Sequence, residues 1–255
     1  DTNDTFTYFI ANNPSEGSVS WSDNTTGVYQ FDPGSDFQDL VAGGTRDVTF
    51  TYYTQNQDGV QSNTSTITIT VTGENDNPIA VPHTDQTDEN DDILNGQVPA
   101  AQDIDTDNIG DGNNNINEVN PNGYVQDSSL ICDNGFDSCG ELIFYPNGSY
   151  TLDVGTDFDY LADGETTTVT FQYTASDLSS PIVGVSDAET VTITIDGQDD
   201  PTTTFNDTNS GNAFEDGEPI TDLVPDLDDA DTNDTFTYFI ANNPSEGSVS
   251  WSDNT

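Results

Sequence analysis

Apolar and polar residues alternate with a period of two along most of the chain. Successive side chains of a β-strand point to opposite faces, so this alternation predicts strands with one buried face. The first part of the chain is predicted to form strands at residues 5–10, 18–22, 28–31, 48–53 and 66–71. Further along, strands are predicted at residues 141–145, 149–152, 168–173 and 189–195. Helical periodicity is lacking, although residues 36–40 and 157–161 each fit one short turn.

Clusters of Gly, Asn, Asp and Pro separate the predicted strands. One of them, Pro146-Asn147-Gly148, is a hairpin-turn signal between two alternating runs. Short strands divided by such turns are typical of antiparallel sandwiches. The chain is therefore predicted to be all-β, with tandem immunoglobulin-like or cadherin-like antiparallel β-sandwich domains. Tyr29, Tyr52, Tyr150 and Tyr173 are expected in the cores rather than at a ligand.

The sequence also repeats itself at long range. Residues 1–25 recur letter for letter as residues 231–255, a period of 230 residues. A fainter repeat inside that period aligns residues 29–40 with residues 150–161, so the period holds two diverged copies of one domain. Tandem arrays of one unit are typical of stalks, fibres and surface adhesins rather than of enzymes.

These repeats predict three pieces. Residues 1–77 are the C-terminal part of a β-sandwich domain A, and residues 78–200 are a complete domain B with loop insertions. Residues 201–255 are the N-terminal part of the next copy of domain A. A complete copy is long enough to form one independent core.

The charge of the chain is extreme. It contains 48 Asp plus Glu and one basic residue, Arg46, which gives a net charge of -47. This charge excludes nucleic acid and anionic membranes as electrostatic partners, and no stretch is apolar enough for membrane insertion. Asp residues beside Asn and Gly in turns offer the oxygen ligands that hard cations prefer. We therefore predict a calcium-dependent extracellular protein. A solvated acidic surface suited to high salt is the alternative, and the two are compatible.

The remaining reactive side chains do not indicate an enzyme. Cys132 and Cys139 are expected to form a local disulfide, as in exported proteins. A structural zinc site is excluded because it needs four ligands and His83 is the only histidine. His83 has no Ser or Cys motif around it, and carboxylate pairs are too abundant to indicate acid–base chemistry. The protein is predicted not to be an enzyme.

Calcium binds about six to eight oxygens, which a junction between two domains can supply. Two linkers, residues 73–78 and 197–201, combine acidic or amide side chains with a Pro that directs the chain. Beyond each linker follow a Glu and an Asp-x-Asp pair, and in a strand both aspartates of such a pair would point to one side. The predicted ligands are Glu74, Asn75, Asp76, Asn77, Glu89, Asp103, Asp105, Asp199, Asp200, Glu215, Asp229 and Asp231.

The alternative for these side chains is an ordinary solvated turn, because Asp and Asn are common turn formers. Repetition of the pattern at two junctions, with Glu89 before Asp103 and Glu215 before Asp229, favours calcium. The aspartates beside Phe37 and Phe158 either bind an ion or cap a short turn.

The motifs resemble a known family. The unit begins with Tyr-x-Phe or Tyr-x-Leu and continues with Asp-Phe-x-x-Leu, a Gly and Thr-Phe-x-Tyr. An Ile-Thr-Val-Thr-Gly strand and an Asn-Asp-Asn-Pro linker follow. This order resembles the cadherin-like and VCBS-type repeats of giant bacterial surface adhesins, over nearly the whole unit. The inserted residues 107–117 and the cysteine loop depart from that pattern. The resemblance implies calcium-rigidified extender domains at the cell surface, which hold a distal binding domain away from the cell.

The expected function is that of a structural repeat in a long extracellular fibre or adhesin stalk, rigidified by calcium at its junctions. Its partners would be neighbouring repeats of the same chain and like chains in a filament. Two alternatives stay open. One is a calcium-dependent glycan- or surface-binding module that uses the loops at residues 107–117 and 132–139. The other is a self-assembling extracellular filament subunit.

Overall fold

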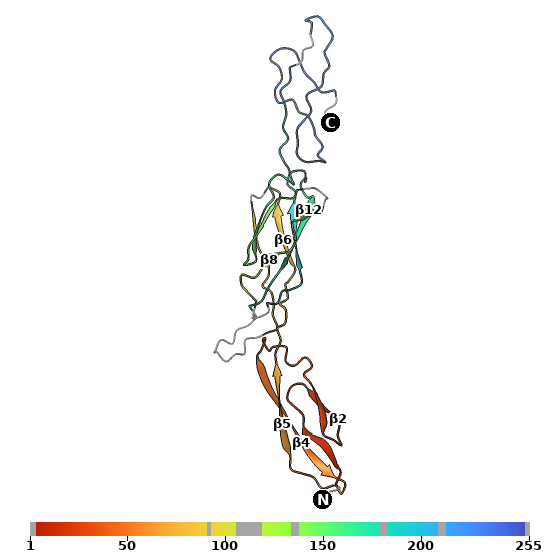
Figure 1. Ribbon diagram of the computed structural model, residues 1–255. Coiled ribbons are helices and arrows are strands. Elements are labelled where there is room, and N and C mark those ends of the chain that lie inside the picture. Colours follow the sequence, from red (N-terminus) through yellow and green to blue (C-terminus); the bar gives the residue numbers. More distant parts are fainter. Residues whose placement is uncertain are drawn as a thin grey trace.

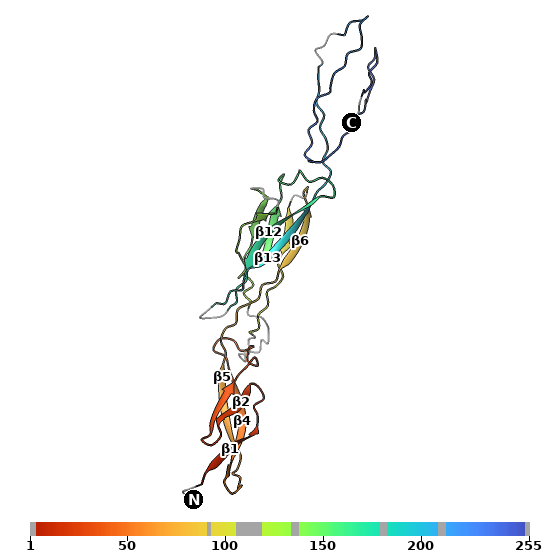
Figure 2. The same ribbon diagram turned by 90° about the vertical axis from the view of Figure 1, so that its right-hand side faces the viewer.

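The computed structural model describes residues 4–90, 93–105, 119–133, 138–178, 183–208 and 213–252. The chain is elongated, and three sections follow one another along its length (Figures 1 and 2). We call residues 4–72 the first section, residues 79–196 the second and residues 202–252 the third. Residues 73–78 form the first junction, and residues 197–201 form the second. None of the described residues forms a helix that is long and apolar enough to cross a membrane.

The first section is a small aromatic sandwich of a sheet and a hairpin. Its antiparallel sheet has the strand order β1-β4-β5, and the hairpin consists of β2 and β3. The rings of Trp21 and Tyr29 lie 6.5 and 5.1 Å from the ring of Phe50, so hairpin and sheet pack through aromatic side chains. Four of the five strands contain the runs predicted from alternation, and β1 contains all of its run except Thr5. The strands are β1 (Phe6–Asn12), β2 (Ser18–Asp23), β3 (Val28–Asp32), β4 (Thr45–Asn56) and β5 (Ser65–Thr72).

The second section contains the larger core. One sheet has the strand order β10-β11-β7, and the other has the order β6-β13-β12-β8, with β9 also paired to β12. Side chains from both sheets are fully buried between them, including Leu152, Phe171 and Ile193 at 0% exposure. The strands are β6 (His83–Asp88), β7 (Leu94–Gln97), β8 (Val125–Gln126), β9 (Ile131–Cys132), β10 (Glu141–Phe144), β11 (Ser149–Asp153), β12 (Thr166–Thr174) and β13 (Glu189–Asp196). The all-β antiparallel sandwich predicted from the sequence is confirmed.

One strand pair differs from the antiparallel expectation. β6 runs parallel to β13, with His83 opposite Val191 and Asp88 opposite Asp196. The alternation rule did not predict β6, because its sequence His-Thr-Asp-Gln-Thr-Asp is polar on both faces. It forms because the edge of β13 is available to an incoming strand far away in sequence. Its parallel direction carries the chain from the first junction to the second.

Buried tyrosines fasten the β6 region to the core. The hydroxyl of Tyr173 donates to the carbonyl oxygen of Val81 at 2.5 Å, and the hydroxyl of Tyr150 donates to Asp85 at 2.9 Å. Both rings are buried, as the sequence predicts for these two residues. Tyr29, which aligns with Tyr150, is instead 38% exposed.

The predicted local turns are present. Gly148, at a φ of 80°, closes the Pro146–Gly148 hairpin, with hydrogen bonds between Tyr145 and Ser149 and between Gly148 and Tyr145. The amides of Leu40 and Leu161 bond the carbonyls of Phe37 and Phe158, three residues earlier, which gives one short turn in each section. A disulfide joins Cys132 to Cys139 across a Cα–Cα distance of 5.8 Å. The predicted insertion at residues 107–117 and residues 134–137 of the cysteine loop lie outside the described residues.

The third section shows that alternation alone does not form a strand. Residues 231–252 have the sequence of residues 1–22, yet the described part of the third section contains no strand. The ring pair Tyr238–Trp251, at 5.6 Å, reproduces the pair Tyr8–Trp21 at 5.5 Å, so a local contact persists. In the first section β1 pairs with β4, and the third section offers no such partner among its described residues. A strand needs a neighbour to satisfy its backbone groups.

Candidate metal centres at the junctions

The second junction is organised around Asp231. Its Oδ2 accepts a hydrogen bond from the backbone N–H of Asp200 at 2.9 Å, so the linker is tied to the third section. The backbone N–H of Asp231 in turn donates to Oδ1 of Asp229 at 3.0 Å, a bond between residues two apart that is typical of Asx turns. Asp229 also accepts from the hydroxyl of Thr202 at 2.7 Å. The Asp-x-Asp pair is thus held by the backbone of a loop.

The preceding section contributes Glu89 to the same place. Glu89 follows the end of β6, is 1% exposed, and its Oε1 accepts from the backbone N–H of Gln198 at 2.6 Å. Ligand oxygens of Glu89, Asp200 and Asp231 lie within 4.8 Å of one another. A second group of oxygens, from Asp199, Asp231 and Asp234, meets the same limit. Carboxylates from both sections and the linker therefore converge on one point.

The electrostatics of this cluster are unfavourable without a cation. Burial raises the pKa of Glu89 to about 7; the bond from Gln198 opposes this shift, and repulsion from Asp200 adds to it. Burial, with repulsion from Asp200, also raises the pKa of Asp159. The pKa of Asp234 is raised by burial and by its acidic neighbours. At the 4.8 Å limit that these oxygens share, the Coulomb repulsion between two ionised carboxylates is about 3.5 kcal/mol at an effective dielectric constant of about 20.

The first junction repeats the same hydrogen-bonded scaffold. The backbone N–H of Asp76 donates to Oδ2 of Asp105 at 2.8 Å, and the N–H of Asp105 donates to Oδ1 of Asp103 at 3.0 Å. Paired backbone bonds between Ile79 and Gln102 at this junction correspond to those between Thr203 and Asp228 at the second. Asp105 is fully buried and Asp103 is 8% exposed. Two junctions with different sequences therefore build one arrangement.

A residue missed by sequence reasoning completes the first junction. Asp177 lies beyond β12, is 1% exposed, and accepts from the side-chain amide of Asn75 at 2.8 Å. Its carboxylate also accepts from the backbone N–H of Gly184 at 2.9 and 3.0 Å. A Cβ at Gly184 would collide with Asp177, Asn75 and Asn77, so the glycine keeps this cradle open. Only its place just after the Thr-Phe-x-Tyr strand could have indicated Asp177.

The structure corrects three details of the predicted sites. Glu89 was grouped with Asp103 and Asp105, yet it lies at the second junction, because β6 runs the length of the section. Glu215 is exposed and belongs to neither carboxylate group found among the described residues. The Asp-x-Asp pairs lie in loops rather than strands, so Asx-type bonds, and not alternation, bring the two aspartates together.

The other predicted ligands differ in their burial. Glu74, Asn77 and Asp199 are exposed at the surface of the junctions. Asn75, Asp76, Asp200 and Asp229 are half-buried.

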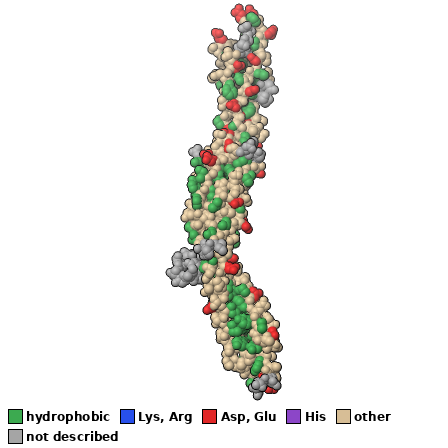
Figure 3. All heavy atoms as spheres, viewed as in Figure 1, with side chains coloured by type: hydrophobic (Ala, Val, Ile, Leu, Met, Phe, Trp, Pro, Cys, Tyr) green, Lys and Arg blue, Asp and Glu red, His purple; other side chains and the backbone are tan. Residues whose placement is uncertain are grey.

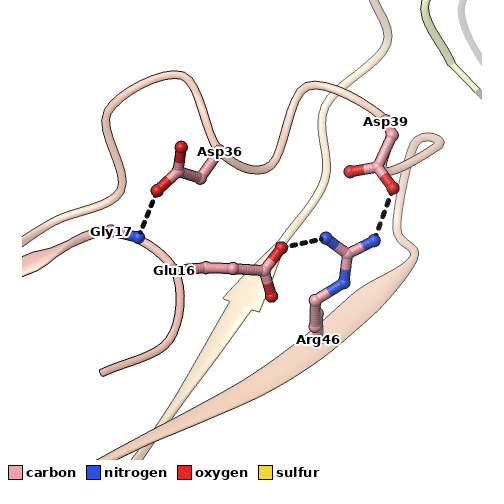
Figure 4. Close-up of polar contacts among 5 residues, drawn as sticks. All are labelled: Glu16, Gly17, Asp36, Asp39 and Arg46. Atoms are coloured by element: carbon pink, nitrogen blue, oxygen red, sulfur yellow. Dashed lines mark hydrogen bonds and ion pairs between the residues drawn. The ribbon is translucent and has the colours of Figure 1, made fainter. Parts of the chain in front are cut away.

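Asp36 and Asp157, which precede Phe37 and Phe158, fasten loops within their sections. Asp36 accepts from the backbone N–H of Gly17 at 2.7 Å, and Asp157 accepts from that of Gly140 at 2.8 Å. Figure 4 shows Asp36 at Gly17 and, nearby, the single Arg side chain, Arg46, between Glu16 and Asp39. The guanidinium of Arg46 donates to Glu16 at 2.8 Å and to Asp39 at 2.6 Å. Its bond to Asp39 lowers the pKa of that carboxyl. These contacts fasten loops within the first section.

The oxygens of the second junction fit a hard cation. Oε2 of Glu89 and Oδ1 of Asp231 are buried and have no hydrogen-bond partner among the described residues. Buried polar atoms without a partner are rare because each loses its hydration. Both residues belong to the carboxylate group in which Asp200 is the third member. An all-oxygen set of carboxylates is the ligand chemistry of calcium rather than of zinc or copper.

Neither a protein-family model nor a curated protein sequence matches the chain. Among solved structures it is similar to Drosophila N-cadherin EC1-4, with 16% identity and a TM-score of 0.42, over 80% of this chain and 45% of that one. It is similar to human mucin-like protocadherin EC1-2, with 13% identity and a TM-score of 0.35, over 76% of this chain and 84% of that one. Tandem Ig repeats of Dlar give 10% identity and a TM-score of 0.20, over 76% and 84% of the two chains. The chain thus spans less than half the length of the N-cadherin chain it matches.

Proposed function

We propose that the chain is a spacer repeat of a long extracellular fibre or adhesin stalk, stiffened by calcium at its junctions. One observation carries the proposal. Carboxylates from two sections and their linker converge at the second junction, where Glu89 and Asp231 are buried. Each has an oxygen that finds no hydrogen-bond partner in the described part of the chain. A chain without a ligand at this place would leave those carboxylates both desolvated and repelling one another.

The residues that would hold the ion follow from these contacts. At the second junction they are Glu89, Asp199, Asp200, Asp229 and Asp231, and at the first they are Asn75, Asp76, Asp103, Asp105 and Asp177. Bound calcium supplies positive charge that offsets the repulsion among these side chains. The linker aspartates already bond the Asp-x-Asp loops through their backbone, so each linker is tied to the section that follows it before the ion arrives.

The role of the ion would be mechanical. A linker alone allows its two sections to swing, because few contacts cross it. An ion held by both sections resists that motion, and many such junctions in series would make a long rod. Extracellular calcium modules bind at about 0.1–1 mM, near the free concentration outside cells, so the rod would be stiff there.

The test removes charge from one junction without changing side-chain size. In the double variant Asp229→Asn/Asp231→Asn each side chain keeps one carbonyl oxygen, which can still accept from the backbone N–H of residue 231 and of Asp200, respectively. The hydroxyl of Thr202 can accept from the new amide at position 229. Calcium titration calorimetry should show weaker binding at one site, since ligand charge tunes affinity. Small-angle scattering in calcium should show a more flexible second junction, while the second section stays folded.

The matched control is Asp216→Asn/Asp226→Asn, which removes the same charge from exposed positions of the third section. It should leave calcium affinity and scattering unchanged. Equal calcium stoichiometry and equal rigidity in the junction variant and the wild type would contradict the proposed function.

A further inference from the structure

The second section connects its two junctions through neighbouring strands. The chain enters it at the first junction, shortly before β6, and leaves it at the second junction, directly after β13. These junctions lie at opposite ends of the section (Figures 1 and 2). β6 and β13 run parallel and pair directly, from His83 opposite Val191 to Asp88 opposite Asp196. A pull on the two ends of the chain therefore draws the two strands past each other along their length.

Such a pull loads the whole strand pair at once. The backbone hydrogen bonds of a parallel pair are evenly spaced along the strands and join one strand to the other. A force along the strands is shared among these bonds, whereas a force across one end of the pair breaks them one after another. The pairing extends over all six residues of β6, so the bonds of the entire strand must break together.

The attachment of β6 decides how much tension the section can bear. Among the described residues β6 pairs with β13 alone, whereas β13 also pairs with β12 over eight residues. The sequence of β6 is polar on both faces, so burial of apolar side chains contributes little to its attachment. Hydrogen bonds must therefore hold this strand in the section.

Further hydrogen bonds fasten β6 before its start, in its middle and after its end. Before the strand, the hydroxyl of Tyr173 bonds both the N–H and the carbonyl of Val81, at 3.2 and 2.5 Å. In the middle, the hydroxyl of Tyr150 reaches over from the other sheet and donates to Asp85 at 2.9 Å. After the strand, the backbone N–H of Glu89 donates to the carbonyl of the last residue of β13 at 3.0 Å. The strand is thus secured along its whole length.

We propose that β6 and β13 form a shear clamp, a strand pair that makes the second section resist tension along the chain. This function goes beyond spacing and beyond the stiffness of the junctions, and it rests on the proposed stalk only for the source of the tension. A polar strand suits this edge, because it bears load through its backbone whatever its side chains are. The clamp needs no ion, since its contacts lie within the second section.

The test pulls single molecules of the whole chain in two directions at one loading rate. Handles on the two chain ends slide β6 along β13. Handles on the N-terminus and on an azide-bearing residue in place of the exposed Asp187 draw the adjacent starts of both strands apart and unzip the pair. The end-to-end pull should need a several-fold higher force to unfold the section. Equal forces in the two directions would overturn the inference.

Two conditions make these forces comparable. Acidic side chains lie along all three sections on the face in view in Figure 3, so the pulls are made at about 0.15 M salt, where like charges more than about 8 Å apart are screened. Reduction of the disulfide identifies the unfolding of the second section. It lengthens the released chain by about 20 Å, because Cys132 and Cys139 are 7 residues apart.

Two matched variants test the fastening of β6. Tyr150→Phe removes the bond to Asp85 and keeps the buried ring. Tyr124→Phe makes the same change at another buried tyrosine, whose hydroxyl accepts from the backbone N–H of Ala101 at 3.0 Å, outside β6. Tyr150→Phe should lower the end-to-end force, and Tyr124→Phe should leave it at the wild-type value. A fall of equal size in both variants, or in neither, would mean that the load does not depend on β6 and would overturn the inference.

The pulls are repeated in chelator and in calcium. The difference between the two directions should appear in both, because the clamp lies within one section. A difference that appears only in calcium would place the load on a bound ion. That result would overturn the inference while it supported the proposed calcium sites.

Discussion

Replacement of Glu89 by Gln should have opposite effects with and without calcium. The side chains have the same shape, and the oxygen of Gln keeps the hydrogen bond from the backbone of Gln198, at 2.6 Å in the wild type. The substitution removes the charge that burial and the neighbouring aspartates oppose. In chelator Glu89→Gln should therefore be more stable than wild type. Calcium should stabilise the variant less than it stabilises wild type, because one charged ligand is missing from the site.

The magnitude and its pH dependence follow from the pKa. The usual pKa of Glu is 4.5, and burial raises that of Glu89 to about 7. Below 4.5 the carboxyl is protonated in both the folded and the unfolded state, so wild type and variant should be equally stable there. As the pH rises toward 7, the unfolded state loses its proton first, and wild type loses stability relative to the variant. Above that pH the difference should reach about 3 kcal/mol, at about 1.4 kcal/mol per pKa unit.

The measurement must report on the second section. Both tryptophans, Trp21 and Trp251, lie outside it, so tryptophan fluorescence is unsuitable. Hydrogen exchange of the β13 amides, in chelator and in calcium, follows the opening of this section across the pH range. The control is Glu141→Gln, an exposed carboxylate on β10, which should change stability by less than about 0.5 kcal/mol at any pH.

Three outcomes would refute the reasoning about Glu89. The first is a chelated variant no more stable than wild type near pH 8, roughly one unit above the raised pKa. The second is a stability difference that does not vary with pH. The third is equal stabilisation by calcium in both proteins, because ligand-linked stability grows with affinity. Each of these results would show that Glu89 carries no buried charge that a cation offsets.

Two further substitutions test contacts that hold the sections themselves. Arg46→Met should cost the first section about 1 kcal/mol near neutral pH through its bonds to Glu16 and Asp39, and urea unfolding should show the cost fading in acid. The bond to Arg46 lowers the pKa of Asp39 in the folded state, so the stability that the ion pair contributes is lost as the pH falls through that pKa. A loss of stability in Arg46→Met that does not vary with pH would contradict this reasoning. Tyr173→Phe removes the partner of both the N–H and the carbonyl of Val81 and should cost about 2 kcal/mol in thermal unfolding. Unchanged stability would mean that water replaces the hydroxyl.

The sequence predicted the strands that alternate apolar and polar residues, and it missed those that do not. β4 and β12 alternate clearly, and both are central strands. β6 is polar on both faces and forms because it pairs with β13. Its sequence therefore contains no apolar period from which a strand could be predicted. β8 and β9 are two residues long, below the length at which any period can be seen.

The candidate sites were predicted in part for a similar reason. The linkers and Asp-x-Asp pairs are local, so Asp76 with Asp105 and Asp200 with Asp231 could be paired from spacing and are joined in the structure. Glu89 could not be placed from spacing. It follows a strand of six residues, which spans about 20 Å, so a residue close to Asp103 in sequence lies near the other junction. Asp177 enters the first junction through folding of distant strands, which spacing does not reveal.

The duplicated residues show the limit of local pattern most directly. Residues 6–12 form β1 against β4, and the same letters at 236–242 form no strand. Phe239 is 81% exposed, whereas Phe9, its identical counterpart, packs against Tyr53 at a ring distance of 5.3 Å. The first copy has β4 beside it, and the described residues of the third section form no such strand. Strand formation in this chain is therefore decided by the neighbouring strand that satisfies the backbone groups, as β4 does for β1.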